Sequence, residues 1–460
     1  MTPRLLSWIA HATGGRLLGE DRAVDAIATD TRALPGGAAL FVALKGERFD
    51  GHAHVRAAAD GGCVAALVAH PVDVALPQVV VADTERALAS LAAAVQRERA
   101  TRVLAVTGSN GKTSVKTLLH AILSELGGAY ANPGNRNNEI GLPLAVLDAP
   151  DDARFAVYEM GAGKPGDIAY LTAIARPDVA LVNNVAAAHL ERMGSLLGVA
   201  QTKGAIYQAL PGDGVAVVNA DDAFALYFTE RLRGRRVVRF GLEADADVTA
   251  RGIRLGLQGS HFTLVAPQGE IDVALAMPGR HNVRNALAAA AMAMAVGATL
   301  AQVRDGLAAV QGVAGRLATH RLRRGATLVD DSYNANPGSL AAAIDTLAEG
   351  AGEAWLVLGD MRELGADEAA LHAEAGARAK AAGIARLYTL GPLSAHAAQA
   401  FGEGAQRFDA HAALAEALWA ELGAGTTVLV KGSRGSAMDK IVAALLERDA
   451  GRDGETTDAA

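Results

Sequence analysis

The chain has 460 residues, a formal net charge of -7, a hydrophobic fraction of 51% and one cysteine, Cys63. This length exceeds what one ordinary hydrophobic core holds, so we expect two or three domains, and a single cysteine excludes an internal disulfide framework and fits the reducing cytoplasm. The acidic balance leaves no basic footprint for nucleic acid, and the longest apolar run, residues 286–301, is shorter than the roughly 20 residues that a membrane span needs.

Residues 1–83 alternate short apolar strands with polar turns, which predicts a small α/β domain. The opening stretch "MTPRLLSWIAHATGG" has no small-residue cleavage site, so we expect no secretion. Over residues 84–312, short apolar strands alternate with helices as in a buried parallel sheet, and residues 247–275 are richer in strands. The alternation restarts over 313–450 as a Rossmann-like, doubly wound pattern. The tail, 451–460, has no periodicity and is expected to be disordered.

The segment "VTGSNGKTS" (106–114) lies between an apolar strand and a predicted helix. Backbone N–H groups and the helix dipole bind phosphate in this geometry, with the lysine on the β and γ phosphates and the threonine on magnesium. Only two residues separate its first glycine from the glycine-lysine pair, whereas the common loop is longer. We therefore predict an ATP or GTP site in a P-loop ATPase-type central domain. Its residues are Gly108, Ser109, Asn110, Gly111, Lys112, Thr113 and Ser114.

Three polar residues follow later strands of this region. Glu159 ends the apolar run "FAVYE", where an open α/β sheet presents groups to its ligand crevice, and a carboxylate there could hold magnesium. His189 follows "VALVNNV", and Lys203 lies about one turn into a predicted helix. Taken singly, each has a plainer interpretation as a solvated carboxylate, a structural histidine and a surface lysine. However, only eight of the 43 Lys and Arg residues are lysines, which favours roles that arginine cannot fill, such as carbamylation.

Taken together, the motifs resemble one enzyme family. The segments "TGSNGKTS", "YEMGAGKPGD", "NNVAAAHLERMGS", "QTKGAIY", "MPGRHNVRNALAAA", "GVAGRL", "DDSYNANPGS", "LGDMRELG" and "KGSRGS" occur in the order and spacing of the Mur ligases. The resemblance extends from Ala28 to Lys440 and is closest to the type that adds D-alanyl-D-alanine. The short phosphate loop is similar to that of the Mur and folylpolyglutamate ligase superfamily, which uses ATP to activate a carboxylate.

The resemblance implies an α/β enzyme of three domains: an N-terminal domain for the UDP-sugar substrate, a central ATP-binding domain and a C-terminal Rossmann-like domain. The implied reaction joins D-alanyl-D-alanine to UDP-N-acetylmuramoyl-tripeptide through an acyl phosphate. Its products are the pentapeptide precursor of peptidoglycan, ADP and phosphate. The implied cofactors are ATP and Mg²⁺, and we expect a cytoplasmic monomer. The third residue of the peptide, meso-diaminopimelate or lysine, stays open.

Carried over by position, the resemblance assigns the catalytic residues. Lys112 and Thr113 would bind the ATP phosphates and one magnesium ion, with Glu159 as a second ligand of that ion. His189 resembles a ligand of a further magnesium ion. Lys203 matches a family position whose amine is carbamylated in several members, which puts a carboxylate-like group near the metal. The family often has glutamate two positions later, where this chain has alanine, so the role of that glutamate is absent or supplied elsewhere.

The remaining nucleotide contacts are assigned in the same way. His281 and Asn282 resemble the pair that contacts adenine, and Arg316 resembles the arginine that reaches the phosphates from the domain junction. Asp331 resembles the carboxylate on the ribose. The neighbours in "DDSYNANPGS" that complete this set are Tyr333 and Asn336. Read from the residues alone, that segment is a strand-to-helix turn with an Asx cap and a proline.

Three segments resemble substrate-binding parts of the family. Residues 28–55 resemble the segment that holds the UDP group, with the candidates Asp30, Thr31, Arg32, Asp50, Gly51 and His52. Residues 132–143 resemble the asparagine-rich loop near the sugar and peptide, with the candidates Asn135, Asn137 and Asn138. Arg136 departs from the uncharged residue expected in that loop. The last candidates, in "KGSRGS" at a strand end of the C-terminal domain, are Lys431 and Arg434.

Other interpretations remain open from the sequence. The sister ligase that adds the third peptide residue commonly carries an Asp-Asn-Pro-Arg motif, which has no match here, whereas "SYNANP" favours the D-alanyl-D-alanine type. A folylpolyglutamate synthase-like ligase is a further alternative. A nucleotide-dependent switch or motor ATPase belongs to a different class, and the sequence shows no second aspartate-ended strand in the usual motor arrangement. Turnover that requires all three substrates separates a ligase from a switch.

Overall fold

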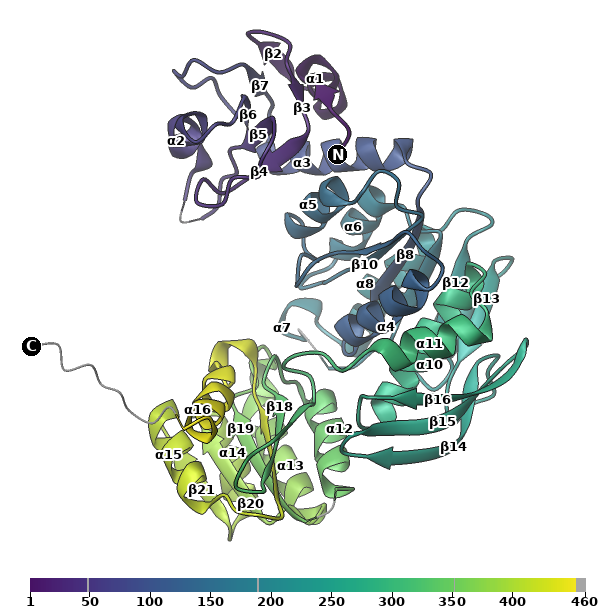
Figure 1. Ribbon diagram of the computed structural model, residues 1–460, viewed down its shortest axis with the longest axis vertical. Coiled ribbons are helices and arrows are strands. Elements are labelled where there is room, and N and C mark those ends of the chain that lie inside the picture. Colours follow the sequence, from purple (N-terminus) through teal and green to yellow (C-terminus); the bar gives the residue numbers. More distant parts are fainter. Residues whose placement is uncertain (48, 188–189, 351, 452–460) are drawn as a thin grey trace, which may run out of the picture.

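The computed structural model describes residues 1–47, 49–187, 190–350 and 352–451. Figure 1 shows an elongated α/β molecule with an N-terminal sheet at one end, a central sheet in the middle and a C-terminal sheet at the other end. Apart from Gly451, the predicted disordered tail lies outside the described residues. Within the described ranges, no helix is long and apolar enough to cross a membrane.

The N-terminal sheet has the strand order β2-β7-β6-β5-β4. Strands β4 to β7 pair in parallel, and β2 is antiparallel at one edge. Helix α1 ends at Gly14, whose φ of 66° is a left-handed conformation that favours glycine. The elements here are β1 Arg4–Leu5, α1 Leu6–Thr13, β2 Arg16–Leu18, β3 Ala23–Val24, β4 Ala26–Ala28, β5 Ala39–Val42, η1 Gly51–His54, α2 Val55–Asp60, β6 Ala65–Val68 and β7 Gln78–Val80.

Helix α3 (Thr84–Glu98) joins the N-terminal sheet to the central part, as its helical spacing predicts. The Asp83 side chain caps its first turn by accepting two backbone N–H bonds. The apolar face of α3 contacts α1 on one side and α5 (Gly141–Asp148) and α6 (Asp167–Ala175) on the other, within one continuous core. The first two parts of the molecule therefore share buried apolar surface.

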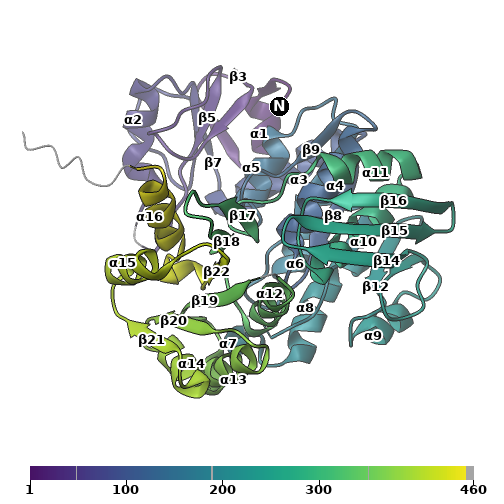
Figure 2. The ribbon, with the colours of Figure 1, turned by 60° about the horizontal axis from the view of Figure 1, so that its bottom comes forward.

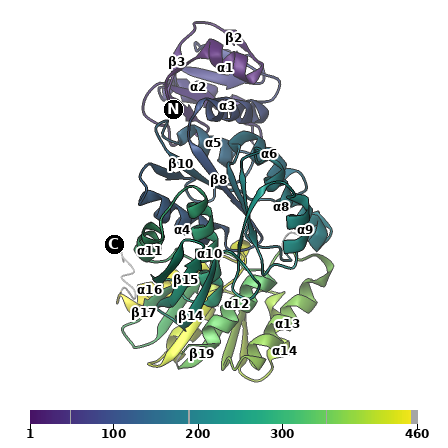
Figure 3. The same cartoon turned by 90° about the vertical axis from the view of Figure 1, so that its right-hand side faces the viewer.

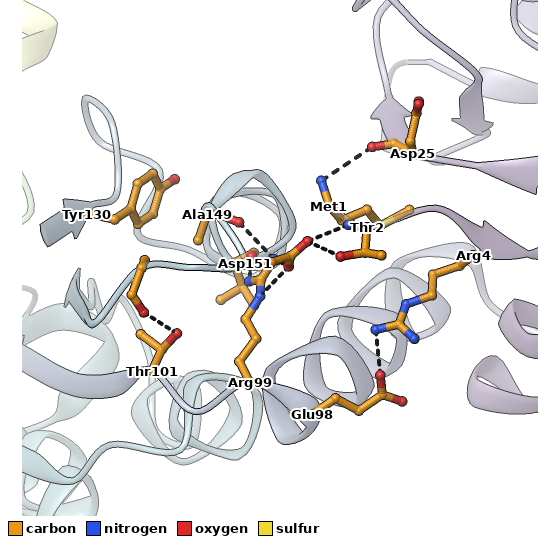
Figure 4. A network of polar contacts seen from close by, with 12 residues as sticks. Met1, Thr2, Arg4, Asp25, Glu98, Arg99, Thr101, Tyr130, Ala149 and Asp151 are labelled. Atoms are coloured by element: carbon orange, nitrogen blue, oxygen red, sulfur yellow. Dashed lines mark hydrogen bonds and ion pairs between the residues drawn. The ribbon is translucent and has the colours of Figure 1, made fainter. Parts of the chain in front are cut away.

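A polar cluster beside α3 reinforces this junction (Figure 4). The Arg99 guanidinium, only 4% exposed, donates to Asp151 Oδ1 over 2.6 Å and to the carbonyls of Val146 and Ala149 near the end of α5. Asp151 Oδ2 in turn accepts the backbone N–H and the hydroxyl of Thr2. Burial raises the pKa of Asp151, but hydrogen bonds from Thr2 and Arg99 outweigh it and lower this pKa to about 2.

The central sheet has the order β13-β12-β11-β8-β10-β9 and is parallel throughout. Tyr158 and Val182 share one buried cluster with α5, α6 and α8 (Leu196–Gln208), and Leu104 and Val157 share another with α4 (Lys112–Ser124) and α10 (Arg280–Ala295). Figure 3 shows these two layers of helices on either side of the central sheet. Burial on both faces explains the continuous apolar runs of these strands. The bounds are β8 Arg102–Thr107, α4 Lys112–Ser124, β9 Ala129–Ala131, β10 Phe155–Glu159, β11 Val179–Val182, α7 Leu190–Met193, α8 Leu196–Gln208, β12 Val215–Asn219, α9 Ala225–Arg231 and β13 Arg236–Phe240.

One local prediction in this part is wrong. The Ser195 side chain caps α8 by accepting the N–H of Gly198, so the helix begins at Leu196. Lys203 is therefore the eighth residue of the helix, about two turns in, rather than about one. Ser195 is a preferred N-cap residue type, and the prediction did not use this signal.

An antiparallel sheet, β14-β15-β16, follows and accounts for the strand-rich stretch predicted around residues 247–275. The alanine-rich run then forms α10, which is buried along almost its whole length, and Gly297 breaks it from α11. Thr299 and Gln302 form a capping box at the start of α11. The bounds are β14 Thr249–Gly256, β15 Gly259–Ala266, β16 Gly269–Leu275, α10 Arg280–Ala295 and α11 Leu300–Ala309.

The C-terminal sheet has the order β17-β18-β22-β19-β20-β21, in which only the β17–β18 pair is antiparallel among the described strands. Helices α12, α13 and α14 cover one face and α15 and α16 the other, as a doubly wound fold requires (Figure 2). The bounds are β17 Ala318–Arg321, β18 Thr327–Asp331, α12 Pro337–Ala348, β19 Glu353–Gly359, η2 Gly365–Asp367, α13 Glu368–Ala381, β20 Arg386–Leu390, α14 Ser394–Phe401, β21 Ala405–Phe408, α15 His411–Glu421, β22 Thr426–Lys431, η3 Arg434–Ser436 and α16 Asp439–Asp449.

Candidate active site

A cavity of about 650 Å³ lies between the central and C-terminal sheets. One wall comes from the carboxyl ends of β8, β10 and β11 and from the start of α10. The other wall comes from the segment Gly315–Leu317, from the turn after β18 and from Lys431 at the end of β22. Ligands of open α/β sheets bind at such strand ends. We call this cavity the cleft.

The phosphate loop lies on the central wall and has the conformation that the sequence predicts. Gly111 has a φ of 78°, and a β-carbon there would approach Asn285 Oδ1 to 2.5 Å and Asn183 Nδ2 to 2.6 Å. Glycine is required at this position both by the backbone angle and by the close approach. The Lys112 amine folds back to donate to the Gly108 carbonyl over 2.9 Å. The loop is thus pre-formed, with the lysine at its centre.

Glu159 is buried at the end of β10 and is 3% exposed. Its Oε2 accepts the Thr113 hydroxyl over 2.9 Å and lies 3.5 Å from Lys116 Nζ, and its Oε1 accepts Asn137 Nδ2 over 2.9 Å. Burial raises the pKa of this carboxyl, but Lys112, Lys116 and the two hydrogen bonds outweigh it, so the pKa is held below its usual value. Glu159 is therefore an ionised carboxylate beside the phosphate loop.

The paired oxygens of Thr113 and Glu159 fit a magnesium ion, because Mg²⁺ prefers hydroxyl and carboxylate oxygen ligands and binds few protein groups directly. Among the described residues, no group of three or more His, Cys, Asp and Glu side chains could hold a metal. The predicted ligand His189 lies outside the described residues. A magnesium site here would therefore rest on few protein ligands and on the phosphates themselves.

Lys203 is 2% exposed and lies deep in α8, outside the described lining of the cleft. Burial, helped by the nearby charge of Lys112, lowers the pKa of its amine from 10.5 to about 7. A large fraction of the amine is therefore uncharged at neutral pH. The uncharged amine is the form that reacts with carbon dioxide, so its chemistry suits the carbamylation that the sequence resemblance implies.

The start of α10 supplies the other predicted contacts on the central wall. His281 and Asn282 both line the cleft. Asn282 Nδ2 donates to the Pro278 carbonyl over 2.8 Å, and its Oδ1 accepts Asn285 Nδ2 over 3.0 Å, which fixes the orientation of the amide. Burial, with Lys431 and Arg284 nearby, lowers the pKa of His281 to about 4. The imidazole is therefore neutral at physiological pH and can offer one donor and one acceptor to a base.

The opposite wall brings together the predicted residues of the C-terminal part. Arg316 Nη2 donates to Thr113 Oγ1 over 3.1 Å, and its guanidinium lies 4.5 Å from the centre of the Tyr333 ring. Arg434 lies 5.3 Å from the same ring and outside the described cleft lining. Lys431 donates to Asp331 over 2.5 Å in a buried ion pair. Lys431, which was predicted to contact the substrate, and Asp331, which was predicted to contact the ribose, are therefore ion-pair partners.

The predicted UDP-binding residues lie in the N-terminal part and are absent from the described lining of the cleft. Arg32 and Asp30 form an exposed, bidentate ion pair. His52 is buried, and both of its ring nitrogens are engaged, Nδ1 with Asp50 and Nε2 with the N–H of Ala69. A structural function for His52 follows from this geometry. Thr31 lies between Asp30 and Arg32 in the sequence, in the connection from β4 to β5. Gly51 lies between Asp50 and His52, in the connection from β5 to β6.

The predicted asparagine loop, residues 132–143, contributes some of its three candidate asparagines to the cleft. Asn137 and Asn138 line the cleft, but Asn135 does not belong to its described lining. Asn138 Oδ1 accepts the N–H of Gly141 over 2.8 Å at the start of α5. Arg136, the residue that departs from the family pattern, turns to Asp148 at the other end of α5, 2.5 Å away. Its charge is thus neutralised away from Glu159.

Several cleft residues were not predicted from the sequence. They include Asn183, Asn285, Lys164 and Arg192 on the lining, and Lys116 beneath it. Asn285 follows Asn282 by three positions on a helix, so helical spacing could have indicated it. Lys116 is one of the eight lysines and lies one helical turn after Lys112, and these two signals together could have indicated it.

Comparisons with known proteins identify the family of the chain. Residues 106–293 match the Mur ligase middle domain, and residues 315–434 match the Mur ligase glutamate ligase domain. The UDP-N-acetylmuramoyl-tripeptide:D-alanyl-D-alanine ligase of Escherichia coli K12 is 47% identical over 96% of this chain and 98% of its own length. The structure of MurF from Acinetobacter baumannii has a TM-score of 0.92 at 34% identity, covering 97% of this chain and 99% of that one. MurF of Thermotoga maritima in complex with ADP has a TM-score of 0.84 at 28% identity, covering 93% and 99%.

Proposed function

This chain belongs to the Mur ligase family, and we propose that it joins D-alanyl-D-alanine to UDP-N-acetylmuramoyl-tripeptide at the expense of ATP. The products are the UDP-linked pentapeptide precursor of peptidoglycan, ADP and inorganic phosphate. The observation that carries the proposal is the cleft itself, in which the phosphate loop and Glu159 face Arg316 and Asp331. It is supported by relatives of this named activity that match the chain almost end to end.

The chemistry needs an activated carboxylate, because a free carboxylate is a poor electrophile. One oxygen of the tripeptide carboxylate attacks the γ-phosphorus of ATP, and the bond to ADP breaks to leave an acyl phosphate. The amine of D-alanyl-D-alanine then attacks the acyl carbon, loses a proton and expels phosphate. Lys112 and Arg316 are placed to stabilise the negative charge that develops on the transferring phosphoryl group.

Magnesium is proposed as the cofactor of this step, with Thr113 and Glu159 as the described residues that would hold it. When bound, Mg²⁺ supplies positive charge to the phosphoryl group. His189 and a carbamylated Lys203 are proposed as further ligands, Lys203 on the support of its buried, largely uncharged amine. Lys116 and Asn137 orient the Glu159 carboxylate, so they hold the proposed ligand in place.

We also propose that the three parts of the chain bind different ligands. Residues 1–83 would bind the UDP group, 84–312 ATP and the metal, and 313–450 the nucleotide from the other side. The side-chain pairs Arg316–Thr113 and Asn336–Asn110 support closure of the last part over ATP. We also propose that the enzyme acts as a monomer. ATP as a co-substrate and the free, buried Cys63 support action in the cytoplasm.

The test is phosphate release by the purified protein with Mg-ATP, D-alanyl-D-alanine and UDP-N-acetylmuramoyl-tripeptide. Each component is omitted in turn, both third-residue forms of the tripeptide are tried, and the product mass is determined. We expect release only when all components are present, with a pentapeptide product. Release without the dipeptide would instead favour an ATPase or a sister ligase, and turnover with a folate substrate would favour the folylpolyglutamate type.

A further inference from the structure

We propose that Lys116 is a positioning residue that couples the asparagine loop to the Glu159 carboxylate at the nucleotide site. Through this loop it also couples the peptide of UDP-N-acetylmuramoyl-tripeptide, called the acceptor below, to that site. This proposal rests on the proposed function, because it concerns how two of the three substrates of that reaction, ATP and UDP-N-acetylmuramoyl-tripeptide, affect each other's binding. Lys116 itself does not line the cleft in the described structure. It acts through residues that do.

The contacts of Lys116 use the whole ammonium group. The side chain lies on α4, one turn after Lys112, and the residue is 6% exposed. Its Nζ donates to the Asn132 carbonyl over 2.9 Å and to the Gly134 carbonyl over 2.8 Å, and it lies 3.5 Å from Glu159 Oε2. An ammonium has three N–H donors, and three acceptors surround this one. The buried charge is thus compensated by partners from two different segments.

The asparagine loop is also attached to Glu159 directly. Asn132 Oδ1 accepts the N–H of Glu159 over 2.9 Å, and Asn132 Nδ2 donates to the Glu159 carbonyl over 3.3 Å. Asn137 binds the carboxylate at Oε1, whereas Thr113 and Lys116 on α4 approach Oε2. The carboxylate therefore joins the loop to the phosphate-loop helix, and Lys116 is the one described side chain that contacts both the loop carbonyls and Oε2.

A purely structural filler would not need a lysine here. Burying an ammonium costs free energy that an apolar side chain of similar length would avoid. An arginine would present a planar, wider fork instead of three donors that converge from a point. The chain otherwise relies on arginine, with only eight lysines among 43 basic residues. The position therefore requires a compact cation that reaches two carbonyls and one carboxylate.

Coupling through these contacts has a measurable signature. If the loop and the nucleotide site share Glu159 and Lys116, then an ATP analogue changes the affinity for the acceptor, and the acceptor changes the affinity for the analogue by the same factor. In Lys116→Met, the loop carbonyls lose their donor and the carboxylate loses its cation. We expect the acceptor Kd to rise about tenfold and the coupling factor to fall toward one.

The experiment measures binding by calorimetry in the full-length enzyme. UDP-N-acetylmuramoyl-tripeptide is titrated with and without a non-hydrolysable Mg-ATP analogue, for the wild type, Lys116→Met and the control Lys380→Met, which removes an exposed lysine of α13. Lys380→Met is expected to match the wild type. A wild-type coupling factor different from one that is lost in Lys116→Met supports the proposal.

Three outcomes would overturn it. They are a wild-type coupling factor of one, an unchanged coupling factor in Lys116→Met, and an equal loss of affinity for both ligands together with a lowered unfolding temperature. The last result identifies Lys116 as a residue needed only for folding. Wild-type turnover with all three substrates is measured in parallel. A wild type that binds both ligands but does not form the pentapeptide contradicts the proposed function, whereas normal turnover with unchanged coupling contradicts only this inference.

Discussion

Asn336 Nδ2 donates to Asn110 Oδ1 over 2.7 Å, although the two residues are 226 positions apart in the chain. Asn336 caps helix α12 of the C-terminal part, and Asn110 lies in the phosphate loop of the central part. The same asparagine thus begins a helix with its oxygen and contacts the nucleotide loop with its nitrogen. The C-terminal part therefore contacts the phosphate loop directly.

Replacing Asn336 should separate these two functions. Asn336→Ala removes a helix cap, which costs about 1 kcal/mol of unfolding free energy, and also removes the contact with Asn110. Thr299→Ala is the matched control, because it removes the capping box of α11, which lies outside the described cleft lining. Urea unfolding should show similar destabilisation in both variants, whereas steady-state kinetics should show a KM for ATP raised about three- to tenfold only in Asn336→Ala. Equal KM values in the two variants would contradict a role for the Asn110 contact.

Lys112→Ala should abolish turnover and leave the binding of the UDP substrate largely intact. The amine lies at the centre of the phosphate loop, so its loss removes charge stabilisation from phosphoryl transfer, an effect of about a hundredfold or more. The predicted UDP-binding residues belong to the separate N-terminal sheet, which Lys112 does not support. Single-turnover phosphate release and calorimetric titration of UDP-N-acetylmuramoyl-tripeptide provide the two readouts. Parallel loss of both would point instead to a misfolded or misplaced part.

Local signals in the sequence were sufficient for much of the fold and for the centre of the site. The glycine spacing around Lys112 and the apolar strand before Glu159 predict positions that the structure has, because both depend on neighbours within a few residues. The α/β architecture follows from the same local alternation. By contrast, the beginning of α8 depends on the Ser195 cap, which the prediction did not use, so Lys203 was placed about one turn into the helix instead of about two.

The contacts that the sequence could not predict join segments that are far apart in the chain. No local pattern indicates that Lys431 would be held by Asp331, 100 positions away, or that Asn336 would reach Asn110. Each pair joins residues of two elements that lie far apart in the sequence. Its formation therefore depends on the tertiary arrangement of those elements and not on the sequence pattern of either one. Sequence signals could have indicated Lys116 itself but not its partners, because the carbonyls of the asparagine loop are backbone groups that every residue type carries.

Lys203→Arg should inactivate the enzyme even though it keeps a positive charge, because a guanidinium cannot form the proposed carbamate. The lowered pKa of about 7 leaves much of the Lys203 amine uncharged near neutrality, ready to bind carbon dioxide. Mass spectrometry under native conditions should therefore find one added carbon dioxide in the wild type and none in the variant. Lys380→Arg, at an exposed position, serves as the control and should keep both activity and the adduct. Wild-type rates in Lys203→Arg would show that the carbamate is not needed.

Asp151→Asn tests whether the junction between the first two parts depends on a charge. The Asp151 pKa is about 2 in the folded protein against an ordinary value of 3.8, so the carboxylate stabilises the fold fully above that ordinary value and loses this effect as the pH falls through about 2. We therefore expect Asp151→Asn to unfold at a lower urea concentration than the wild type by a constant margin from about pH 7 to about pH 5. The margin should shrink only below about pH 4. The adjacent, exposed Asp152→Asn should show no such margin. A margin that persists unchanged at low pH would mean that the Thr2 and Arg99 contacts act through shape rather than charge.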